Sequence, residues 1–409
     1  MNSFRLALCL CVLWLAPWTS AAGADQNEPF SFLVVGDTRT DMFLPGDAGQ
    51  REAIAAEFKS RRPDHDVSLI FDPPTQGGRL AKAIVAKGGK STTYTYREGW
   101  AETITDGEGD AARVRMRRQG QDWVYNRLAA ALQLGAADPK RGPLFLVHSG
   151  DIVYGAKQGA DLWRSPYWQD FQDRFLGRVP LPDAALGLPG RFFPALGNHD
   201  TSNDAALSGV LGVAPYLRDL GLTPQHRVYS FDFRGSRFIF LDSGERYSKG
   251  AWSSTTPPFA EQMALLQQWL SEARDKKIRR VFVSFHKPCF VTDERALAPD
   301  NCPHSVLKPF AADLDISVFT GHTHTTEAYV VDGVRYVVAG AGGALQDLDL
   351  VPRPGQPEEL YWKDAKRVEE YNYLVVEVAS DALRFWVHRY RPSATAAPFE
   401  RVPLFAPAP

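Results

Sequence analysis

The sequence predicts an α/β fold, in which buried strands alternate with helices. Hydrophobic residues make up 44% of its 409 residues, which is enough for one or two well-formed cores. Five short apolar runs each end at a cluster of Gly, Asp, Asn or His residues, as is typical of buried strands bounded by turns. Helical stretches separate several of these runs, so we expect a sheet that helices cover on both faces.

The predicted strands and helices follow one another along most of the chain. The apolar runs cover residues 32–35, 144–147, 192–196, 281–285 and 316–319. Helices are predicted at 48–62, 121–134 and 261–277, the last because Leu266, Trp269, Leu270 and Ala273 recur on one face. Ligands of such folds bind beyond the carboxyl ends of the strands, so five polar clusters at five strand ends are expected to converge on one site.

The first 24 residues are predicted to lie outside the fold, as a secretory signal peptide. Arg5 is followed by an apolar run from Leu6 to Trp18 and then by small residues up to Ala24. The run is shorter than the roughly 18 apolar residues of a transmembrane helix, which favours cleavage over an uncleaved anchor. We therefore expect a periplasmic or secreted protein with no stable membrane anchor after cleavage.

Two cysteines, Cys289 and Cys302, remain once that segment is removed. In an exported chain, two cysteines this close in sequence suggest one disulfide that closes a surface loop. A cysteine metal site is the weaker alternative, because zinc sites normally supply four ligands at close spacing.

Residues 25–409 are predicted to form a single domain with two distinctive regions. Residues 64–118 are rich in Gly, Thr, Lys and Arg and separate the first two polar clusters, so we interpret them as an insertion or lid near the strand ends. Residues 371–378 and 383–390 alternate apolar and polar side chains and predict a hairpin at 371–390 that closes the edge of the sheet.

The charge balance excludes several classes of protein. Lys and Arg number 46 against 48 Asp and Glu, which gives a net charge of −2, and aromatic residues make up 12%. Such a chain has no basic footprint for nucleic acid, so no nucleic-acid partner is expected. It is also too rich in aromatic residues to be mainly disordered.

The polar clusters combine carboxylate, amide, imidazole and phenol groups, which are ligands of metal ions. The candidates are Asp37, Asp151, Tyr154, Asn198, His286, His322 and His324. Seven ligands exceed the need of one ion and suit two ions that share a carboxylate and clamp a phosphoryl group during in-line attack. His199 follows Asn198 and is placed to protonate the leaving oxygen, with Asp200 orienting and charging it.

Five motifs in this order resemble those of the calcineurin-like metallophosphoesterases, and most of all the purple acid phosphatases of the short, single-domain bacterial type. The family motifs GDxG, GDxxY, GNH[D/E], VxxH and GHxH correspond to Gly36-Asp37-Thr38-Arg39, Gly150-Asp151-Ile152-Val153-Tyr154, Gly197-Asn198-His199-Asp200, Val283-Ser284-Phe285-His286 and Gly321-His322-Thr323-His324. They extend over residues 36–324. The resemblance implies a β-sandwich of mixed sheets flanked by helices, with the active site at the carboxyl ends of the strands.

The resemblance also implies a role for each ligand. Fe3+ would be held by Asp37, Asp151, Tyr154 and His324, and a divalent ion such as Zn2+, Fe2+ or Mn2+ by Asn198, His286, His322 and the bridging Asp151. The implied function is an acid phosphatase-like hydrolase of small phosphate monoesters. It would use in-line attack by a metal-held hydroxide, with His199 as the acid for the leaving group.

One position departs from the family pattern. Arg39 stands where the purple acid phosphatases have Gly and where most other members have a ligating His, and the missing His is consistent with Tyr154 as the replacement ligand. Two interpretations of Arg39 stay open. Its planar fork reaches outward to bind a substrate phosphate, or it pairs with a nearby acid such as Asp41.

Two other functions are compatible with the same motifs. A phosphodiesterase acting on nucleotides or phospholipid headgroups would use the same metal pair. It would differ in the pocket walls, which we place at residues 64–118 and around Trp163, Tyr167 and Trp168. A degenerate binding protein would keep the fold without turnover, although the retention of both halves of the metal site argues against it.

Overall fold

The computed structural model describes residues 28–39, 42–45, 64–71, 80–95, 101–106, 113–153, 166–180, 186–201, 204–244, 255–292, 295–344, 370–391 and 399–405. The predicted signal peptide at 1–24 and the predicted helix at 48–62 lie outside these ranges, as do Asp41, Tyr154 and Trp163. Within the described ranges, no helix is both long enough and apolar enough to cross a membrane.

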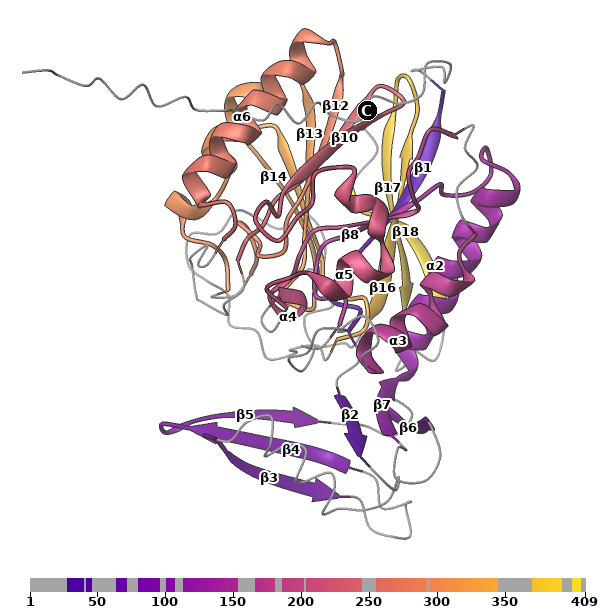
Figure 1. Ribbon diagram of the computed structural model, residues 1–409, viewed down its shortest axis with the longest axis vertical. Helices are drawn as coiled ribbons and strands as arrows, with labels where there is room; N and C mark the ends of the chain where they lie inside the picture. Colours follow the sequence, from indigo (N-terminus) through magenta and orange to yellow (C-terminus); the bar gives the residue numbers. More distant parts are fainter. Residues whose placement is uncertain are drawn as a thin grey trace, which may run out of the picture.

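Two six-stranded mixed sheets make up the main body (Figure 1). The first has the order β18-β17-β16-β1-β8-β9, with bounds Phe399–Pro403, Leu383–Tyr390, Tyr371–Val378, Phe30–Val35, Leu146–His148 and Phe192–Pro194. The second has the order β10-β11-β12-β13-β15-β14, with bounds Tyr229–Phe233, Ser236–Phe240, Arg280–Ser284, Asp315–Thr320, Val334–Ala339 and Thr326–Val331. Strands β1, β8 and β9 are parallel to one another, as are β11, β12, β13 and β15.

The two sheets pack face to face through aromatic side chains. Phe32 on β1 lies 4.9 Å from Phe282 on β12 and 5.2 Å from Phe238 on β11, measured between ring centroids. Phe193 on β9 lies 4.4 Å from Phe231 on β10. Edge-to-face and offset pairs of this kind fill the layer between the sheets densely. This layer accounts for the apolar inner face of each sheet, and the helices described next account for the apolar outer face.

Helices cover the outer faces of the sandwich. The α-helices are α2 (Gln119–Ala137), α3 (Pro166–Arg174), α4 (Asn198–Thr201), α5 (Ser208–Val213), α6 (Phe259–Asp275) and α7 (His304–Leu307). Leu266 and Leu270 of α6 are buried in one cluster with residues of the second sheet, and Leu128 of α2 is buried in the cluster that contains the first sheet. Figure 1 shows α6 and α2 on opposite sides of the two sheets. The predicted α/β fold of mixed sheets flanked by helices is therefore confirmed.

Residues 64–118 contribute most of two smaller antiparallel sheets. One has the order β3-β4-β5 (Asp66–Phe71, Leu80–Lys87, Lys90–Thr95), and the other has the order β2-β7-β6 (Met42–Pro45, Arg113–Arg118, Ala101–Asp106). In Figure 1 both lie below the main body, beyond the end where α4 is drawn. The position agrees with an insertion near the strand ends, and its role as a lid stays a prediction.

The C-terminal hairpin differs in one respect from expectation. Strands β16 and β17 pair antiparallel, but the edge of the first sheet is β18, which pairs with β17. The prediction that the hairpin closes the sheet was therefore wrong. Strand β18 has only five residues and ends at Pro403, so its sequence is too short and irregular to predict a strand.

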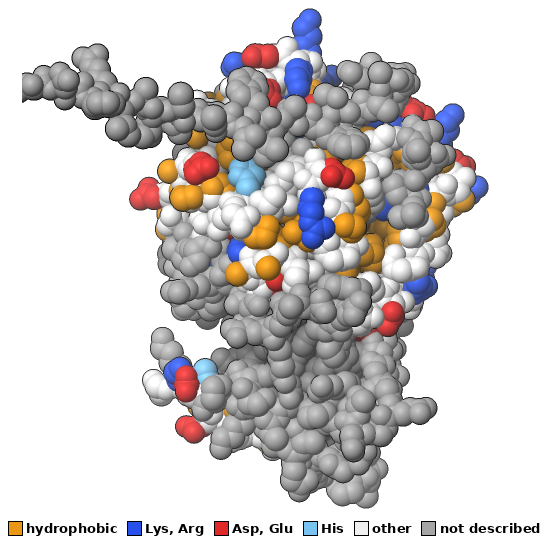
Figure 2. Space-filling model, viewed as in Figure 1, with side chains coloured by type: hydrophobic (Ala, Val, Ile, Leu, Met, Phe, Trp, Pro, Cys, Tyr) orange, Lys and Arg blue, Asp and Glu red, His pale blue; other side chains and the backbone are white. Residues whose placement is uncertain are grey.

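The predicted disulfide is present. Cys289 and Cys302 are bonded, with 5.5 Å between their Cα atoms, and the bond closes the loop that follows β12. On the face shown in Figure 2, acidic and basic side chains of the described residues are interspersed with hydrophobic ones.

Candidate active site

Polar residues from both sheets meet at the carboxyl ends of their strands. The first sheet supplies Asp37 after β1, Asp151 after β8 and Asn198 at the start of α4. The second supplies His286 after β12, and His322 and His324 after β13. Because the parallel strands of each sheet end on the same side, residues far apart in the sequence reach one place.

The backbone is unusual at four of these residues. Asp37, Asp151, His322 and His324 have φ angles of 53°, 56°, 74° and 52°, in the left-handed region that non-glycine residues rarely adopt. Each such residue costs on the order of 1–3 kcal/mol and persists only where neighbouring structure enforces it. Asp37 is held by its own N–H, which donates to Gly150 O at 2.9 Å, and by Ala344 N–H, which donates to Asp37 O at 2.7 Å.

Two motif glycines leave room for the carboxylates. A Cβ atom on Gly197 would lie 2.2 Å from Asp151 Oδ1, and one on Gly321 would lie 2.4 Å from Asp37 Oδ2. These distances are far below van der Waals contact. Glycine before Asn198 and before His322 is therefore a steric requirement of the site.

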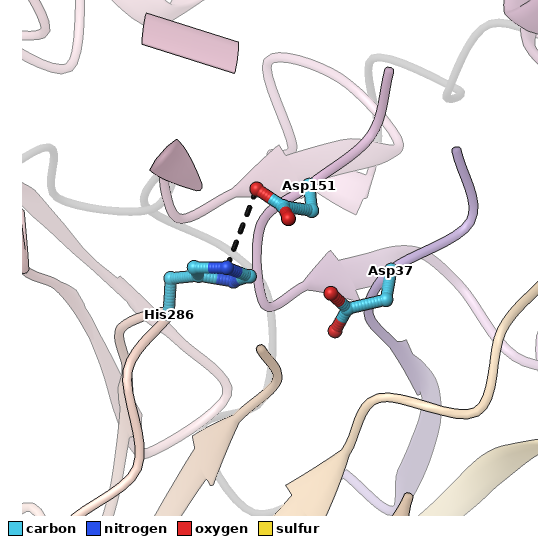
Figure 3. A group of neighbouring side chains, drawn as sticks. All are labelled: Asp37, Asp151 and His286. Carbon is cyan, nitrogen blue, oxygen red and sulfur yellow. Dashed lines mark ion pairs between the residues drawn. The ribbon is translucent and has the colours of Figure 1, made fainter. Parts of the chain in front are cut away.

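Asp37, Asp151 and His286 form a buried cluster whose side chains point toward one another (Figure 3). One ligand atom of each lies within 4.8 Å of the others, and His286 Nε2 is 3.3 Å from Asp151 Oδ1. His322 Nδ1 lies 3.2 Å from His286 Nε2, and His324 Nε2 lies 3.6 Å from Asp37 Oδ1. Asp37 and His286 are wholly buried.

The charged groups of this cluster shift one another's pKa values. Burial raises the pKa of Asp37 to about 7, with Asp151 adding to the effect. Burial also acts to raise the pKa of Asp151, but the charges of His286 and His199 outweigh it and hold that pKa well below its usual range. The same carboxylates overcome the effect of burial on His286 and raise its pKa to about 9. Two buried carboxylates therefore draw positive charge into the site.

Among the candidate metal ligands that the structure describes, two buried oxygens are left without hydrogen-bond partners. Asp37 Oδ2 accepts the N–H of His322 at 2.8 Å, but Asp37 Oδ1 and Asn198 Oδ1 accept no hydrogen bond. Such atoms are costly to bury unless a ligand satisfies them. His286 Nδ1 lies 2.9 Å from Ser149 O, which leaves Nε2 directed into the cluster. Oxygen and imidazole atoms arranged in this way fit a metal ion.

His199 and Asp200 are placed differently from each other. The imidazole of His199 is 29% exposed, and its Nε2 lies 3.8 Å from Asp151 Oδ2. Asp200 is buried, and its two oxygens accept four backbone N–H groups, those of Gly197, Asp151, Ile152 and Val153, at 2.9 to 3.2 Å. Asp200 thus joins the second and third motifs, and its expected hold on His199 stays a prediction.

Arg39 is turned into the site and is only 8% exposed. Its Nη2 lies 3.1 Å from His324 Nε2, and its Nε lies 3.8 Å from Asp151 Oδ2. Its contact with a substrate phosphate stays a prediction. Asp41, the alternative partner, and Tyr154, the expected iron ligand, lie outside the described residues.

Two buried residues, His148 and Lys287, lie beside the site. Nδ1 of His148 accepts the N–H of Gly150 at 3.1 Å, so its Nε2–H donates to Thr38 Oγ1 at 2.9 Å. Lys287 directly follows His286.

Arg295 was not singled out in the sequence, because no motif contains it. Its Nη2 donates to Thr323 O at 3.3 Å from within the disulfide loop. Burial and His286, together with the charges of Arg295 and Lys287, hold the pKa of His322 well below its usual range. Both cations are therefore near enough to act on the site.

Carboxylate, amide and imidazole side chains at the strand ends of a two-sheet sandwich define the class of metal-dependent phosphoesterases. A family model described as calcineurin-like phosphoesterase matches residues 120–326, and the chain belongs to this family. The match includes Asp151, Asn198, His286, His322 and His324, whereas Asp37 and Arg39 precede it. Membership of this family, together with the buried cluster, suggests a dinuclear metal site.

Solved structures with some similarity include a dimetal phosphatase from Danio rerio and GAP50, the anchor in the inner membrane complex of Plasmodium. The first is 14% identical, with a TM-score of 0.42 over 92% of this chain and 99% of that one. The second is also 14% identical, with a TM-score of 0.43 over 70% of this chain and 84% of that one. A search of curated proteins finds no match.

Proposed function

We propose that the chain is an exported, metal-dependent hydrolase of phosphate monoesters. The observation that carries the proposal is the buried cluster of Asp37, Asp151 and His286, with His199 Nε2 3.8 Å from Asp151 Oδ2. Asp37 Oδ1 and Asn198 Oδ1 accept no hydrogen bond among the described residues, and a bound cation would satisfy them. The imidazole of His199, which is 29% exposed, can supply a proton beside this cluster.

Metal ions bound here would polarise the phosphoryl oxygens and lower the pKa of a nearby water molecule. The chain's own residues do the rest. The ligand residues would hold the ions that bind the phosphoryl group. The oxygen of a water molecule bonds to phosphorus as the bond to the leaving alcohol oxygen breaks, and His199 gives the proton at its Nε2 to that oxygen. The backbone N–H of His199 donates to Asp151 Oδ1 at 2.9 Å, so the position of His199 is linked to that of the candidate metal ligand Asp151.

The cations around the cluster favour monoesters over diesters. A monoester carries up to two negative charges at neutral pH and a diester only one. Additional cations therefore attract the monoester more strongly. Burial lowers the pKa of Lys287 to about 8, and Asp242 and Asp151 partly oppose this shift, so the side chain is still mainly charged at neutral pH. Arg295 adds a second fixed charge near His322.

Export is supported by the leader-like first 24 residues and by the disulfide between Cys289 and Cys302. Disulfides persist in oxidising compartments, such as the periplasm or the extracellular space. Cell fractionation together with N-terminal sequencing of the mature protein tests this part of the proposal. A chain that keeps Met1 in the cytoplasm would contradict it.

We do not extend the proposal to iron or to the purple acid phosphatase subtype. The expected iron position needs Tyr154, which lies outside the described residues, and His324, whose Nε2 is in contact with Arg39. Tyr154 as an iron ligand therefore stays a prediction. It is tested by the visible absorption of the iron-loaded protein and by its loss in Tyr154→Phe.

The function is tested by steady-state hydrolysis of an aryl phosphate monoester and of the matching bis-aryl diester at acidic and neutral pH. The protein is stripped with a chelator and reloaded with Mn2+ or Zn2+. We expect metal-dependent hydrolysis with a higher kcat/KM for the monoester, lost in His286→Ala and retained in His226→Ala, whose imidazole lies outside the cluster. A preference for the diester would identify a phosphodiesterase, and an ion-loaded protein without either activity would identify a binding protein.

A further inference from the structure

One half of the site already contains a cation that belongs to the chain. Arg39 lies against His324 and Asp151, with Nη2 3.1 Å from His324 Nε2 and Nε 3.8 Å from Asp151 Oδ2. Asp37 is near enough for the charge of Arg39 to act on it, and Asp37 Oδ1 is 3.6 Å from His324 Nε2. Two carboxylates and an imidazole around one point form an ion-binding arrangement, and here a guanidinium group lies within it.

The contact between Arg39 and His324 uses the electron pair that a metal ion would need. A guanidinium group has N–H donors and no acceptor, so Arg39 donates and His324 Nε2 accepts. A histidine nitrogen binds a metal through this same lone pair. His324 cannot bind Arg39 and an ion through Nε2 at the same time.

Charge argues in the same direction. Arg39 brings the positive charge of a guanidinium group to this point. It is 8% exposed, so the charge is held where little water can screen it. A second metal ion against Asp37, Asp151 and His324 would therefore lie beside a buried positive charge, with Lys287 and Arg295 also close to the cluster.

Thr38, which directly precedes Arg39, is held by three hydrogen bonds, and these limit the movement of the backbone from which the Arg39 side chain extends. Thr38 O accepts from Gln121 Nε2 at 2.6 Å and from Tyr125 Oη at 2.9 Å, and Thr38 Oγ1 accepts from His148 at 2.9 Å. Thr38 and Tyr125 are buried. The residue before Arg39 is thus anchored on three sides by α2 and by the end of β8.

In the other half of the site, the contacts given for the described residues include no guanidinium group. Asn198 Oδ1 accepts no hydrogen bond there, and His286 Nε2 and His322 Nδ1 share a hydrogen bond of 3.2 Å, whose proton an imidazole can give up to an ion, as a guanidinium group cannot. Asp151 Oδ1 lies 3.3 Å from His286 Nε2. This half presents oxygen and nitrogen ligands toward one point.

From these contacts we infer that the Arg39 guanidinium takes the place of one of the two metal ions that the family suggests, so that the chain binds a single ion. The inference rests on the proposed function for that one ion, which binds among Asp151, Asn198, His286 and His322. Arg39 supplies a permanent single charge where a removable ion of higher charge would otherwise lie. It is a positioning residue that neutralises Asp37 and Asp151 and orients His324.

The test counts bound ions and does not depend on activity. Chelator-stripped full-length protein is titrated with Mn2+, and bound metal is measured by mass spectrometry and by electron paramagnetic resonance. We expect one Mn2+ with a mononuclear spectrum in the wild type and two spin-coupled Mn2+ in Arg39→Ala. Arg39→Lys keeps a positive charge at the position and is the matched control, with one ion expected.

His324→Ala provides a second test in case Arg39→Ala fails to fold. With Arg39 present, His324 binds no ion, so His324→Ala is expected to keep the one ion of the wild type. Two ions in the wild type, or one ion in a folded Arg39→Ala, would overturn the inference and leave the proposed function standing. No bound ion in any variant would instead contradict the proposed function, and this inference with it.

Discussion

His199 and Asp200 are neighbours in the sequence, yet their side chains have different surroundings. The partly exposed His199 is open enough to serve as the proposed proton donor, whereas both oxygens of the buried Asp200 accept hydrogen bonds from backbone N–H groups. Burial and the neighbouring Asp151 raise the pKa of Asp200 to about 7, and its backbone hydrogen bonds oppose that shift. At the scale of single residues, the third motif combines the proposed proton donor with a structural brace.

The first prediction concerns the proton donor. His199→Ala should lower kcat by about 10²–10⁴-fold for substrates with poor leaving groups, because these need a proton as the P–O bond breaks. The loss should be much smaller for aryl phosphates with acidic leaving groups, and bound metal should be unchanged. Measuring kcat over a series of leaving groups checks this. An equal loss across the series would show that His199 is not the acid.

The second prediction concerns the brace. Asp200→Ala removes the acceptor of four backbone N–H groups that remain buried, so we expect a loss of unfolding free energy of about 3 kcal/mol or more. Chemical denaturation measures it. Asp219→Ala changes an acid on the surface and is the control, with an effect near zero. Similar stability of the two variants would remove Asp200 from its structural role.

At the scale of elements, the first sheet combines strands from the two ends of the chain, β1 with β16, β17 and β18. Strand β17 pairs with β16 and β18, and this places His388 opposite Arg401, with its ring 5.1 Å from that of Tyr373. Burial, Arg401 and Arg127 lower the pKa of His388 to about 4, and Glu377 partly opposes the shift. The folded state therefore disfavours the charged imidazole.

The third prediction follows from the sign of this shift. The unfolded chain binds a proton at His388 near pH 6.5 and the folded chain only near pH 4, so unfolding takes up a proton between these values. The contribution of His388 to stability is therefore complete above pH 6.5 and is lost as the pH falls toward 4. His388→Gln should reduce the slope of unfolding free energy against pH in this window. An unchanged slope would show that His388 titrates alike in both states.

At the scale of the whole molecule, the site joins the two sheets. Asp37, Asp151 and Asn198 come from the first sheet, and His286 and His322 come from the second. An ion bound between them would link the two halves of the sandwich and neutralise buried carboxylates. We therefore expect metal binding and global stability to be coupled.

The fourth prediction tests that coupling. Removing bound metal with a chelator should lower Tm by several degrees, since an ion at 100 times its Kd stabilises the native state by about 2.7 kcal/mol. Calorimetry before and after adding back Mn2+ measures the shift, and chelator presaturated with the ion is the control. A Tm that does not depend on metal would show that no ion bridges the sheets.

Much of the site could be predicted from the sequence because its information is local. A short apolar run followed by Gly-Asp or Gly-His specifies a buried strand and the turn after it, and the carboxyl ends of parallel strands share one edge. This reasoning anticipated Asp37, Asp151, Asn198, His286, His322 and His324 as neighbours. The α/β class followed from the same runs, and the family followed from the resemblance of the five motifs.

Only the tertiary structure decided how the other residues contribute, because contacts between distant segments leave no periodic signal in the sequence. The direction of Arg39 depends on His324, 285 positions away, and the role of Asp200 depends on the turn after β8, 47 to 49 positions away. Strand β18 takes the sheet edge only because β17 offers it hydrogen bonds. The sequence by itself determined which chemical groups gather at the site, and packing determined which of them face an ion and which face one another.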